Sequence, residues 1–366
     1  MKTAKILRIC LILALPLLNL CASAPSTGQI ALTQRISASD PRFRYEGRLD
    51  FSDSNSPVVI WQASRINIDF QGDAIRLLFG DAKGQCFFNA QVDGSNTVVE
   101  IREGTPAQPA MLSGFGTGRH HLTLFKRSEA NAGTVRFRGI EIAPAAKVWL
   151  PAPPNYKLAM EFFGDSITVG ACNEDGAADQ WDNRRTHNAA FSFATLTAEA
   201  FNADYRNTAV SGMGVSTGYV DMKAGEIWDR LYPNTNSSRA DLSKWTPQVV
   251  FVNYGENDAS YPSAHKQSFP TNYTDRYVAL IHAIRAAYPN AHIVLLRGGM
   301  FNGAQNEPLR QAWEAAVIQL EAADKGISHF VLKHWVSTHP RVADDRIMAD
   351  KLVAWLKEQK FMSAYR

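Results

Sequence analysis

The spacing of the apolar residues changes partway along the chain, and this change limits the possible folds more than any other feature. Over residues 41–142 apolar residues alternate with other residues, as in Ile66, Ile68 and Phe70. A period of two is typical of strands that bury one face. Glycine-containing turn signals separate these runs, and none carries a persuasive helical stripe. We therefore expect an antiparallel β-sandwich, of the jelly-roll kind, over residues 30–148.

A proline cluster, Pro151-Ala152-Pro153-Pro154, ends this region. Clustered prolines lack backbone donors and favour extended linkers, so we place a domain boundary here. Beyond it, short apolar runs alternate with stretches of helical spacing, which predicts a parallel sheet covered by helices, an α/β domain over residues 158–366. In such a sheet reactive groups lie at the carboxyl ends of the strands. The expected strands are 158–163, 205–210, 248–252, 292–296 and 328–332.

Residues 1–24 have the form of a secretory signal peptide. Three basic residues precede an apolar run, which leads to the small-x-small motif Ala22-Ser23-Ala24. An uncleaved membrane anchor is the alternative, but the apolar run is short for a span and no later segment is long enough. Lipidation at Cys21 is less favoured, because Leu20 stands where a lipobox has a small residue. We expect a secreted or periplasmic protein with no membrane contact after cleavage.

The charge and cysteine content narrow the possible partners and scaffolds. The formal net charge is +3, and Lys2, Lys5 and Arg8 of the expected signal peptide account for all of it. The mature chain is formally neutral and has no basic stripe, so we expect no nucleic-acid partner. Only Cys86 and Cys172 remain, too few for a disulfide-held scaffold. A bridge between them is an alternative, but we expect two free, buried thiols.

Three glycine-containing motifs follow expected strands. Gly164-Asp165-Ser166 can place the Ser166 hydroxyl in a cleft at the start of a helix or turn. Ser211-Gly212-Met213-Gly214 can expose backbone N–H groups to an oxyanion. Gly255-Glu256-Asn257-Asp258 can aim the Asn257 amide at the same charge. Taken singly, the motifs are better explained as an N-cap, a flexible loop and an Asx-turn, respectively.

A histidine motif, His339-Pro340, follows the last expected strand and precedes the final helix, which we expect to start near Val342. A histidine at this depth can accept the serine proton. His187 and His334 are the alternatives for this base. The other eight of the nine histidines lack this placement, among them His120, His121, His282 and His292. Four motifs in order at the ends of strands of one sheet favour a hydrolase with a serine nucleophile.

These motifs resemble the serine, glycine, asparagine and histidine blocks of the SGNH hydrolase superfamily, from about residue 158 to the end of the chain. The resemblance implies that Ser166 is the nucleophile and His339 its base. It also implies an oxyanion hole made by the N–H groups of Ser166 and Gly212 and the amide of Asn257. With a β domain in front, the chain further resembles carbohydrate esterase family 2, whose members remove acetyl groups from plant polysaccharides.

The sequence departs from the SGNH pattern beside the histidine. Many members have an aspartate three residues before it, where this chain has Val336. A backbone carbonyl can hold the imidazole instead, or a carboxylate can come from elsewhere in the fold. Some family 2 esterases resemble the first case, and we predict a Ser166–His339 dyad oriented by a carbonyl.

Substrate contacts are expected from Asp165 and from three aromatic residues near the catalytic loops: Trp181, Tyr254 and Trp335. Each aromatic can carry a sugar ring, although such residues more often belong to the core. No residue spacing matches a metal site, so we expect neither a metal nor an organic cofactor.

The favoured function is removal of O-acetyl groups from a plant polysaccharide such as xylan or glucomannan, by way of an acetyl-enzyme. The alternatives are a lipase, a thioesterase or another small-ester hydrolase of the SGNH type, and a carbohydrate-binding protein with an inactive esterase domain. The first would need a long apolar acyl pocket. The sequence leaves open the polymer, the hydroxyl that is deacetylated, the role of the β domain and the oligomeric state.

Overall fold

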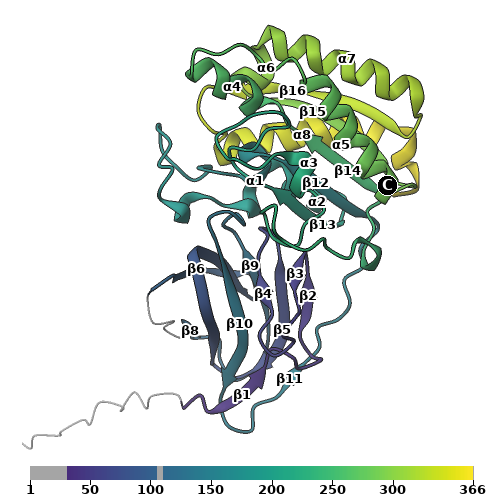
Figure 1. The fold of residues 1–366 in the computed structure, drawn as a ribbon. Helices are drawn as coiled ribbons and strands as arrows, with labels where there is room; N and C mark the ends of the chain where they lie inside the picture. Colours follow the sequence, from purple (N-terminus) through teal and green to yellow (C-terminus); the bar gives the residue numbers. More distant parts are fainter. Residues whose placement is uncertain (1–30, 105–109, 366) are drawn as a thin grey trace, which may run out of the picture.

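The computed structural model describes residues 31–104 and 110–365. The expected signal peptide lies outside the described residues. In the described part of the chain, no helix is both long and apolar enough to cross a membrane. The chain forms two layered regions, a β region at the bottom of Figure 1 and an α/β region above it.

The β region is one antiparallel sheet folded into two layers, as the alternating sequence predicts. The long strand β6 joins the layers: its first half pairs with β10 and its second half with β7 and β9. The alternating residues Ile66, Ile68 and Phe70 all face the core between the layers. The strands are β1 (Gln34–Ser37), β2 (Arg44–Glu46), β3 (Leu49–Asp50), β4 (Val58–Val59), β5 (Arg65–Gln71), β6 (Ala74–Val92), β7 (Ser95–Arg102), β8 (Ala110–Ser113), β9 (Arg119–Lys126), β10 (Gly133–Ile142) and β11 (Val148–Trp149).

The α/β region holds a five-stranded sheet in the order β13-β12-β14-β15-β16, and every pairing is parallel. This confirms the predicted sheet. Two strands run several residues further than predicted, because their C-terminal ends still pair with each other, as Gly299 does with Trp335 and Met300 with Val336. The strands are β12 (Ala159–Gly164), β13 (Asp204–Ala209), β14 (Val249–Asn253), β15 (His292–Met300) and β16 (Ile327–Val336).

Helices cover both faces of this sheet. Residues of α5 and α7 share one core cluster with Val250 and Val252, while α2 and α8 share another with Val249 and Phe251. The side chains of β14 therefore alternate between the two helical layers. The helices are α1 (Ser166–Val169), α2 (Phe193–Ala200), α3 (Ala224–Ile227), α4 (Glu256–Ala264), α5 (Tyr273–Ala287), α6 (Phe301–Gln305), α7 (Glu307–Ala323) and α8 (Val342–Glu358), the last beginning where the sequence predicts.

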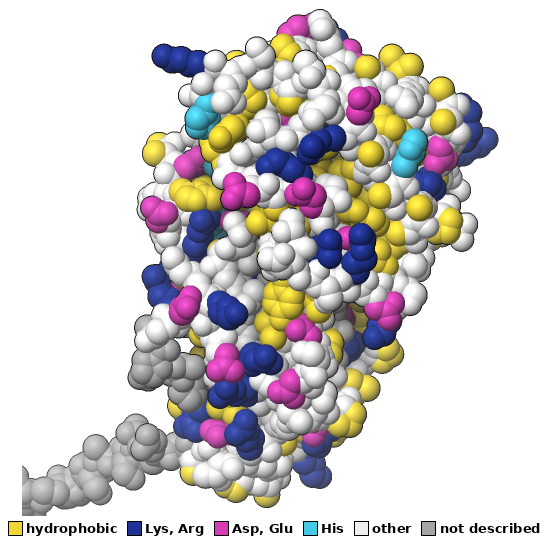
Figure 2. Space-filling view, in the orientation of Figure 1, with side chains coloured by type: hydrophobic (Ala, Val, Ile, Leu, Met, Phe, Trp, Pro, Cys, Tyr) yellow, Lys and Arg dark blue, Asp and Glu magenta, His cyan; other side chains and the backbone are white. Residues whose placement is uncertain are grey.

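The two regions share a core. Ile60 and Trp61, which follow β4, belong to the same buried cluster as α5 and α7. The buried guanidinium of Arg48 pairs with Glu161 of β12 at 3.0 Å. Separating the regions would leave a buried charge without its partner, so this contact helps to fix how the regions sit against each other. On the face shown in Figure 2, basic and acidic side chains are interspersed over both regions.

Candidate active site

The carboxyl ends of the parallel strands meet around a cavity of about 540 Å³. Its walls come from the loops that follow β12, β13, β14, β15 and β16, together with one residue of the β region. The predicted residues Ser166, Gly212, Asn257 and His339 all line it. The other lining residues are Asn131, Trp181, Arg184, Ser211, Tyr219, Val220, Glu256, Ser260, Met300, Asn302 and Ser337.

Ser166 is the first residue of the short helix α1, directly after β12. The Asp165 side chain caps this helix by accepting the N–H of Ile167 at 3.1 Å. The cap fixes the turn that carries the serine, and leaves Ser166 4% exposed at the cavity wall. Such a position suits a nucleophile that must meet substrate but not bulk water.

His339 is oriented by a carboxylate. Asp179 Oδ2 lies 2.7 Å from His339 Nδ1, and it also accepts the backbone N–H of His339 at 3.2 Å. The predicted orientation by a backbone carbonyl is therefore wrong, and the alternative of a carboxylate from elsewhere in the fold is correct. Position 336 is a valine and supplies no carboxylate. Asp179, from the loop between α1 and α2, contacts the histidine instead.

An arginine also keeps Asp179 in place. Arg341 donates to Asp179 Oδ1 at 2.7 Å and to the carbonyl of Cys172 at 3.1 Å. Partial burial raises the pKa of Asp179, but the hydrogen bonds from His339 and Arg341 outweigh burial and hold this pKa well below its usual range. Asp179 is therefore ionised over the working pH range and can stabilise an imidazolium at His339.

Two groups in the cavity can meet an oxyanion besides the N–H of Ser166. Gly212 has a φ of 78°, a conformation that favours glycine, and its loop follows β13 at the cavity wall. Asn257 Nδ2 lies 3.2 Å from Asp165 Oδ2 and 3.1 Å from the carbonyl of Met213. Both amide hydrogens thus have acceptors in the resting site, and donation to an oxyanion has to be shared with one of them.

Asp258 fixes the backbone that follows Gly212. Its carboxylate accepts the N–H groups of Val215, Ser216 and Thr217 at 2.7–3.0 Å. Asp258 is fully buried, and burial raises the pKa of its carboxyl. The motif that follows β14 therefore supplies two functions, a cavity amide and an anchor for the neighbouring loop.

Of the four residues expected to contact the substrate, only Trp181 lines the cavity. Trp181 lines the cavity, is 37% exposed and packs on the His339 ring at 5.6 Å. Tyr254 is 2% exposed and lies in the core, so its prediction as a sugar platform is wrong. Trp335 is 37% exposed but packs on Phe301 outside the cavity lining, which does not support the same role there. Asp165 is buried and caps α1, so it holds the site rather than the substrate.

The alternative histidines are engaged elsewhere. His187 is fully buried against Cys172 and Trp181, and burial lowers its pKa to about 3. His334 Nε2 lies 2.7 Å from Asp344 Oδ1, outside the cavity lining. His339 remains the base that the geometry favours.

Sequence reasoning missed Asp179, Arg184 and Asn131. The first two belong to a polar loop between α1 and α2 that has neither a strand end nor a recurring spacing to mark it. Asn131 lies between β9 and β10, in the β region, where no site residue was expected. The one available signal was the missing aspartate at Val336, which implied a replacement but not its place.

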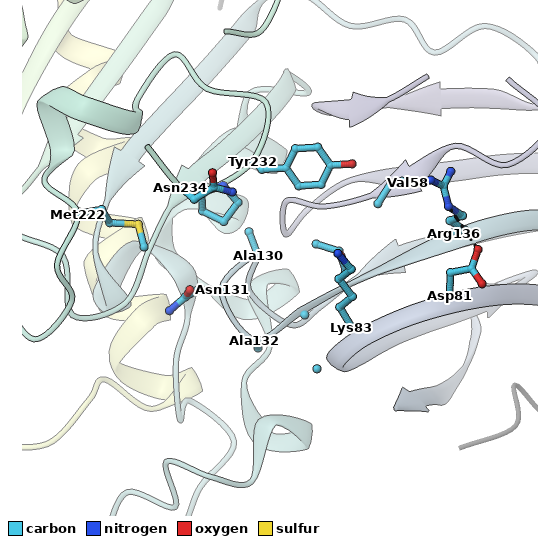
Figure 3. Close-up of a pocket in the computed structure, with 14 residues that line it drawn as sticks. Val58, Asp81, Lys83, Ala130, Asn131, Ala132, Arg136, Met222, Tyr232 and Asn234 are labelled. Atoms are coloured by element: carbon cyan, nitrogen blue, oxygen red, sulfur yellow. Dashed lines mark ion pairs between the residues drawn. The ribbon is translucent and has the colours of Figure 1, made fainter. Parts of the chain in front are cut away.

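A larger hollow of about 690 Å³ adjoins the catalytic cavity, and Asn131 lines both. Figure 3 shows its walls, with Lys83 and Arg136 from the β region and Tyr232 and Asn234 from the α/β region. None of its lining residues is a serine, a cysteine or a histidine. The smaller cavity is therefore the candidate active site, because it alone of the two pairs a nucleophile with a base.

One group of side chains beside the cavity has the residue types of a metal site. Cys172 Sγ, a carboxylate oxygen of Asp179 and a ring nitrogen of His339 lie within 4.8 Å of one another. Asp179 already accepts from a histidine and an arginine, and burial raises the pKa of the Cys172 thiol. A protonated thiol is a poor ligand, so this group fits an orienting contact better than a metal centre. Cys172 and Cys86 are both free and buried, as predicted.

Comparisons with known proteins agree with this architecture. Residues 45–154 match the carbohydrate esterase 2 N-terminal family, and residues 162–352 match the GDSL-like lipase/acylhydrolase family. A cellulase/esterase, CelE, of Acetivibrio thermocellus is 33% identical over 87% of this chain, which spans 40% of that relative. An acetylxylan esterase / glucomannan deacetylase of Cellvibrio japonicus is 29% identical over 84% of this chain and 88% of its own length.

A solved family two carbohydrate esterase from Clostridium thermocellum, in complex with cellohexaose, superposes with a TM-score of 0.73. It is 32% identical, and the match covers 86% of this chain and 98% of that one. Another solved family two carbohydrate esterase, from Cellvibrio japonicus, has a TM-score of 0.76 at 19% identity, with 91% and 99% of the two chains covered. The chain therefore belongs to the family 2 carbohydrate esterases and is a carboxylic ester hydrolase with a GDSL-like catalytic domain.

Proposed function

We propose that this protein is a secreted serine esterase that removes O-acetyl groups from plant polysaccharides, xylan or glucomannan, through an acetyl-enzyme. The observation that carries the proposal is the joint position of Ser166, Gly212, Asn257 and the Asp179-paired His339 on one cavity. The relative named acetylxylan esterase / glucomannan deacetylase and the relative solved with cellohexaose support a carbohydrate substrate.

Acylation begins when His339 takes the proton of the Ser166 hydroxyl and the oxygen attacks the acetyl carbonyl carbon. The carbonyl electrons move to the former carbonyl oxygen, and the N–H groups of Ser166 and Gly212 and the amide of Asn257 stabilise that charge. Asp179 stabilises the imidazolium that forms. Collapse of the intermediate breaks the ester bond, and His339 returns its proton to the departing sugar oxygen.

Deacylation repeats these steps with water. His339 takes a proton from water, the hydroxide attacks the acetyl carbon, and Ser166 leaves as its alkoxide takes the proton back from the imidazolium. Acetic acid and the free hydroxyl of the serine result, and the acid releases its proton to water as acetate.

The cavity is suited to a sugar ester by its size and its walls. Its volume lies within the range of about 300–1,000 Å³ that is usual for small-ligand sites. Asn131 and Asn302 offer amides for sugar hydroxyls, and Trp181 offers a ring face beside the base. A long apolar acyl channel would need a different lining, which is why we favour an acetyl ester over a lipid.

Export is part of the proposal, since acetylated plant polymers lie outside the cell that degrades them. The basic residues, the apolar run and the Ala22-Ser23-Ala24 motif support cleavage after residue 24. Mass spectrometry of the N-terminus of exported protein tests this step directly. An N-terminus that still carries residues 1–24 would contradict it.

Acetate release tests the substrate. The purified mature chain is incubated with acetylated xylan and acetylated glucomannan, and p-nitrophenyl acetate is compared with a p-nitrophenyl ester of a long fatty acid. We expect acetate from at least one polymer and preference for the acetyl ester. Preference for the long-chain ester, or no acetate from either polymer, would contradict the proposal. Ser166→Ala serves as the inactive control.

A further inference from the structure

We propose that Glu129, a residue of the β region, is a positioning residue of the esterase, because its carboxylate holds the loop that carries Gly212. Residues Ser211–Gly214 are called the oxyanion loop below. The inference rests on the proposed esterase function and assigns the β region a part in it, namely completing the catalytic site of the other region.

Glu129 lies between β9 and β10 and is 1% exposed. One carboxylate oxygen, Oε2, accepts the backbone N–H of Ser211 at 3.0 Å. The other, Oε1, accepts from the guanidinium of Arg184 at 3.2 Å. Ser211 and Arg184 both line the catalytic cavity, so a single buried carboxylate joins two of its walls.

The segment that carries Glu129 is itself held firmly. The buried Lys126 ammonium donates to the carbonyls of Ser128 and Glu129 at 2.8 and 3.0 Å. Gln62 Oε1 accepts the N–H of Ala130 at 3.1 Å. These bonds fix the backbone on both sides of Glu129, so its side chain is a rigid support rather than a mobile surface group.

The oxyanion loop is therefore clamped from two directions. Glu129 holds the N–H of Ser211 on one side of Gly212, and Asp258 holds the N–H groups of residues 215–217 on the other. The carbonyl of Gly212 is bonded to the N–H of Tyr219 at 2.8 Å. An oxyanion hole works because its donors are fixed in advance. Loss of the hydrogen bonds to either Glu129 or Asp258 should displace the N–H of Gly212.

The second oxygen of Glu129 acts on the base side of the cavity. Arg184, which it holds, lies over the Trp181 ring at 4.2 Å, and Trp181 packs on His339 at 5.6 Å. The carboxylate thus supports the oxyanion loop directly and the histidine wall through two stacked side chains. The two interactions need two accepting oxygens. A carboxylate has both, whereas the side-chain amide of a glutamine has only one.

Another ion pair between the two regions lies away from the oxyanion loop and serves as a comparison for Glu129. Arg65 of β5 pairs with Asp204 across the same interface at 3.1 Å, but Asp204 begins β13 at the end of the sheet away from the cavity. Asp204→Asn is therefore a matched control. It weakens an ion pair between the regions without touching the oxyanion loop.

The test compares wild type, Glu129→Ala, Glu129→Gln and Asp204→Asn as full mature chains. We expect Glu129→Ala to lower kcat for p-nitrophenyl acetate roughly 10- to 100-fold with little change in KM, since a misplaced donor costs less than a removed one. Glu129→Gln keeps one acceptor and should lose less. Asp204→Asn should keep wild-type kcat. Hydrogen exchange followed by mass spectrometry should show faster exchange in the oxyanion-loop peptide of both Glu129 variants than in wild type. The same peptide of Asp204→Asn should exchange as in wild type.

Unchanged kcat and unchanged exchange in both Glu129 variants would overturn the inference, as would an equal loss in Asp204→Asn. Glu129→Gln is close to isosteric, so it decides the question if Glu129→Ala does not fold. A wild-type chain that hydrolyses no acetyl ester would instead contradict the proposed function. The exchange measurement needs no substrate and still decides the role of Glu129 in that case.

Discussion

Asp179 Oδ2 lies 2.7 Å from His339 Nδ1, although 160 positions separate the two residues. In the proposed mechanism this contact supplies the third member of a serine–histidine–aspartate arrangement, in the order Ser166, Asp179, His339 along the chain. The same roles recur on unrelated folds with the residues in other orders, because geometry rather than sequence position defines them.

Removing the charge of Asp179 should impair the chemistry rather than the fold. Asp179→Asn is expected to lower kcat roughly 100- to 10,000-fold, since the amide can favour the wrong tautomer of His339 and cannot stabilise an imidazolium. Steady-state kinetics with p-nitrophenyl acetate measure this. Val336→Ala, three residues before His339, is the matched control and should be nearly silent. A nearly active Asp179→Asn would favour a dyad instead.

Loss of the nucleophile should be close to complete. Ser166→Ala is expected to lower kcat at least about 10,000-fold, because no other group can form the acetyl-enzyme. Its melting temperature should match that of wild type, because the change removes only one oxygen at the cavity wall. Ser211→Ala is a control within the same cavity, since the buried hydroxyl of Ser211 has no hydrogen-bond partner in the structure. Equal losses in both variants would mean that the nucleophile is misassigned.

The Asn257 amide should act mainly on the transition state. Asn257→Ala is expected to lower kcat roughly 100- to 1,000-fold with a small change in KM, the loss that is typical of one oxyanion donor. Asn302→Ala removes another amide of the same cavity, one that bonds to Glu256, and should change kcat far less. If Asn257→Ala acted on KM instead, its amide would bind substrate rather than the oxyanion.

Much of the fold could be predicted because the two periods of the sequence are physical consequences of strands and helices. The alternation at Ile66 and Ile68 and the helical spacing at Tyr277 each place their side chains in a core cluster. The bend that lets β6 serve both layers of the sandwich could not be predicted. It depends on which strands pair with each half, and no local pattern encodes that.

The candidate site was predictable only where it coincides with strand ends. Ser166, Gly212, Asn257 and His339 follow four strands, and the topology brings them together. Asp179 and Glu129 lie in loops that no local sequence pattern marks. Only the tertiary packing of the chain brings them to the site. Tyr254 also follows a strand, but its side chain turns into the core, because nearness in sequence to a catalytic motif says nothing about direction.

Trp181 should contribute to binding as well as to the base. Trp181→Ala is expected to raise KM for an acetylated oligosaccharide roughly tenfold, about 1.4 kcal/mol, through loss of a ring face. Some loss of kcat should accompany it, because the ring packs on His339. Trp335→Ala removes an equally exposed tryptophan outside the cavity and should leave both constants unchanged. Similar effects of both variants would point to a different binding surface.

His187 should make the fold sensitive to acid. Burial lowers its pKa from 6.5 to about 3, so between these values the unfolded chain binds a proton that the folded chain does not. The free energy of unfolding should therefore fall as pH drops through this window, by at most roughly 1.4 kcal/mol per pH unit from this group. Urea unfolding of wild type and His187→Gln between pH 7 and about 4 measures the difference in slope, which should be absent for His282→Gln on the exposed side of α5. Parallel curves for wild type and His187→Gln would mean that His187 is protonated in the folded chain, and its neutral packing against Cys172 and Trp181 would have to be abandoned.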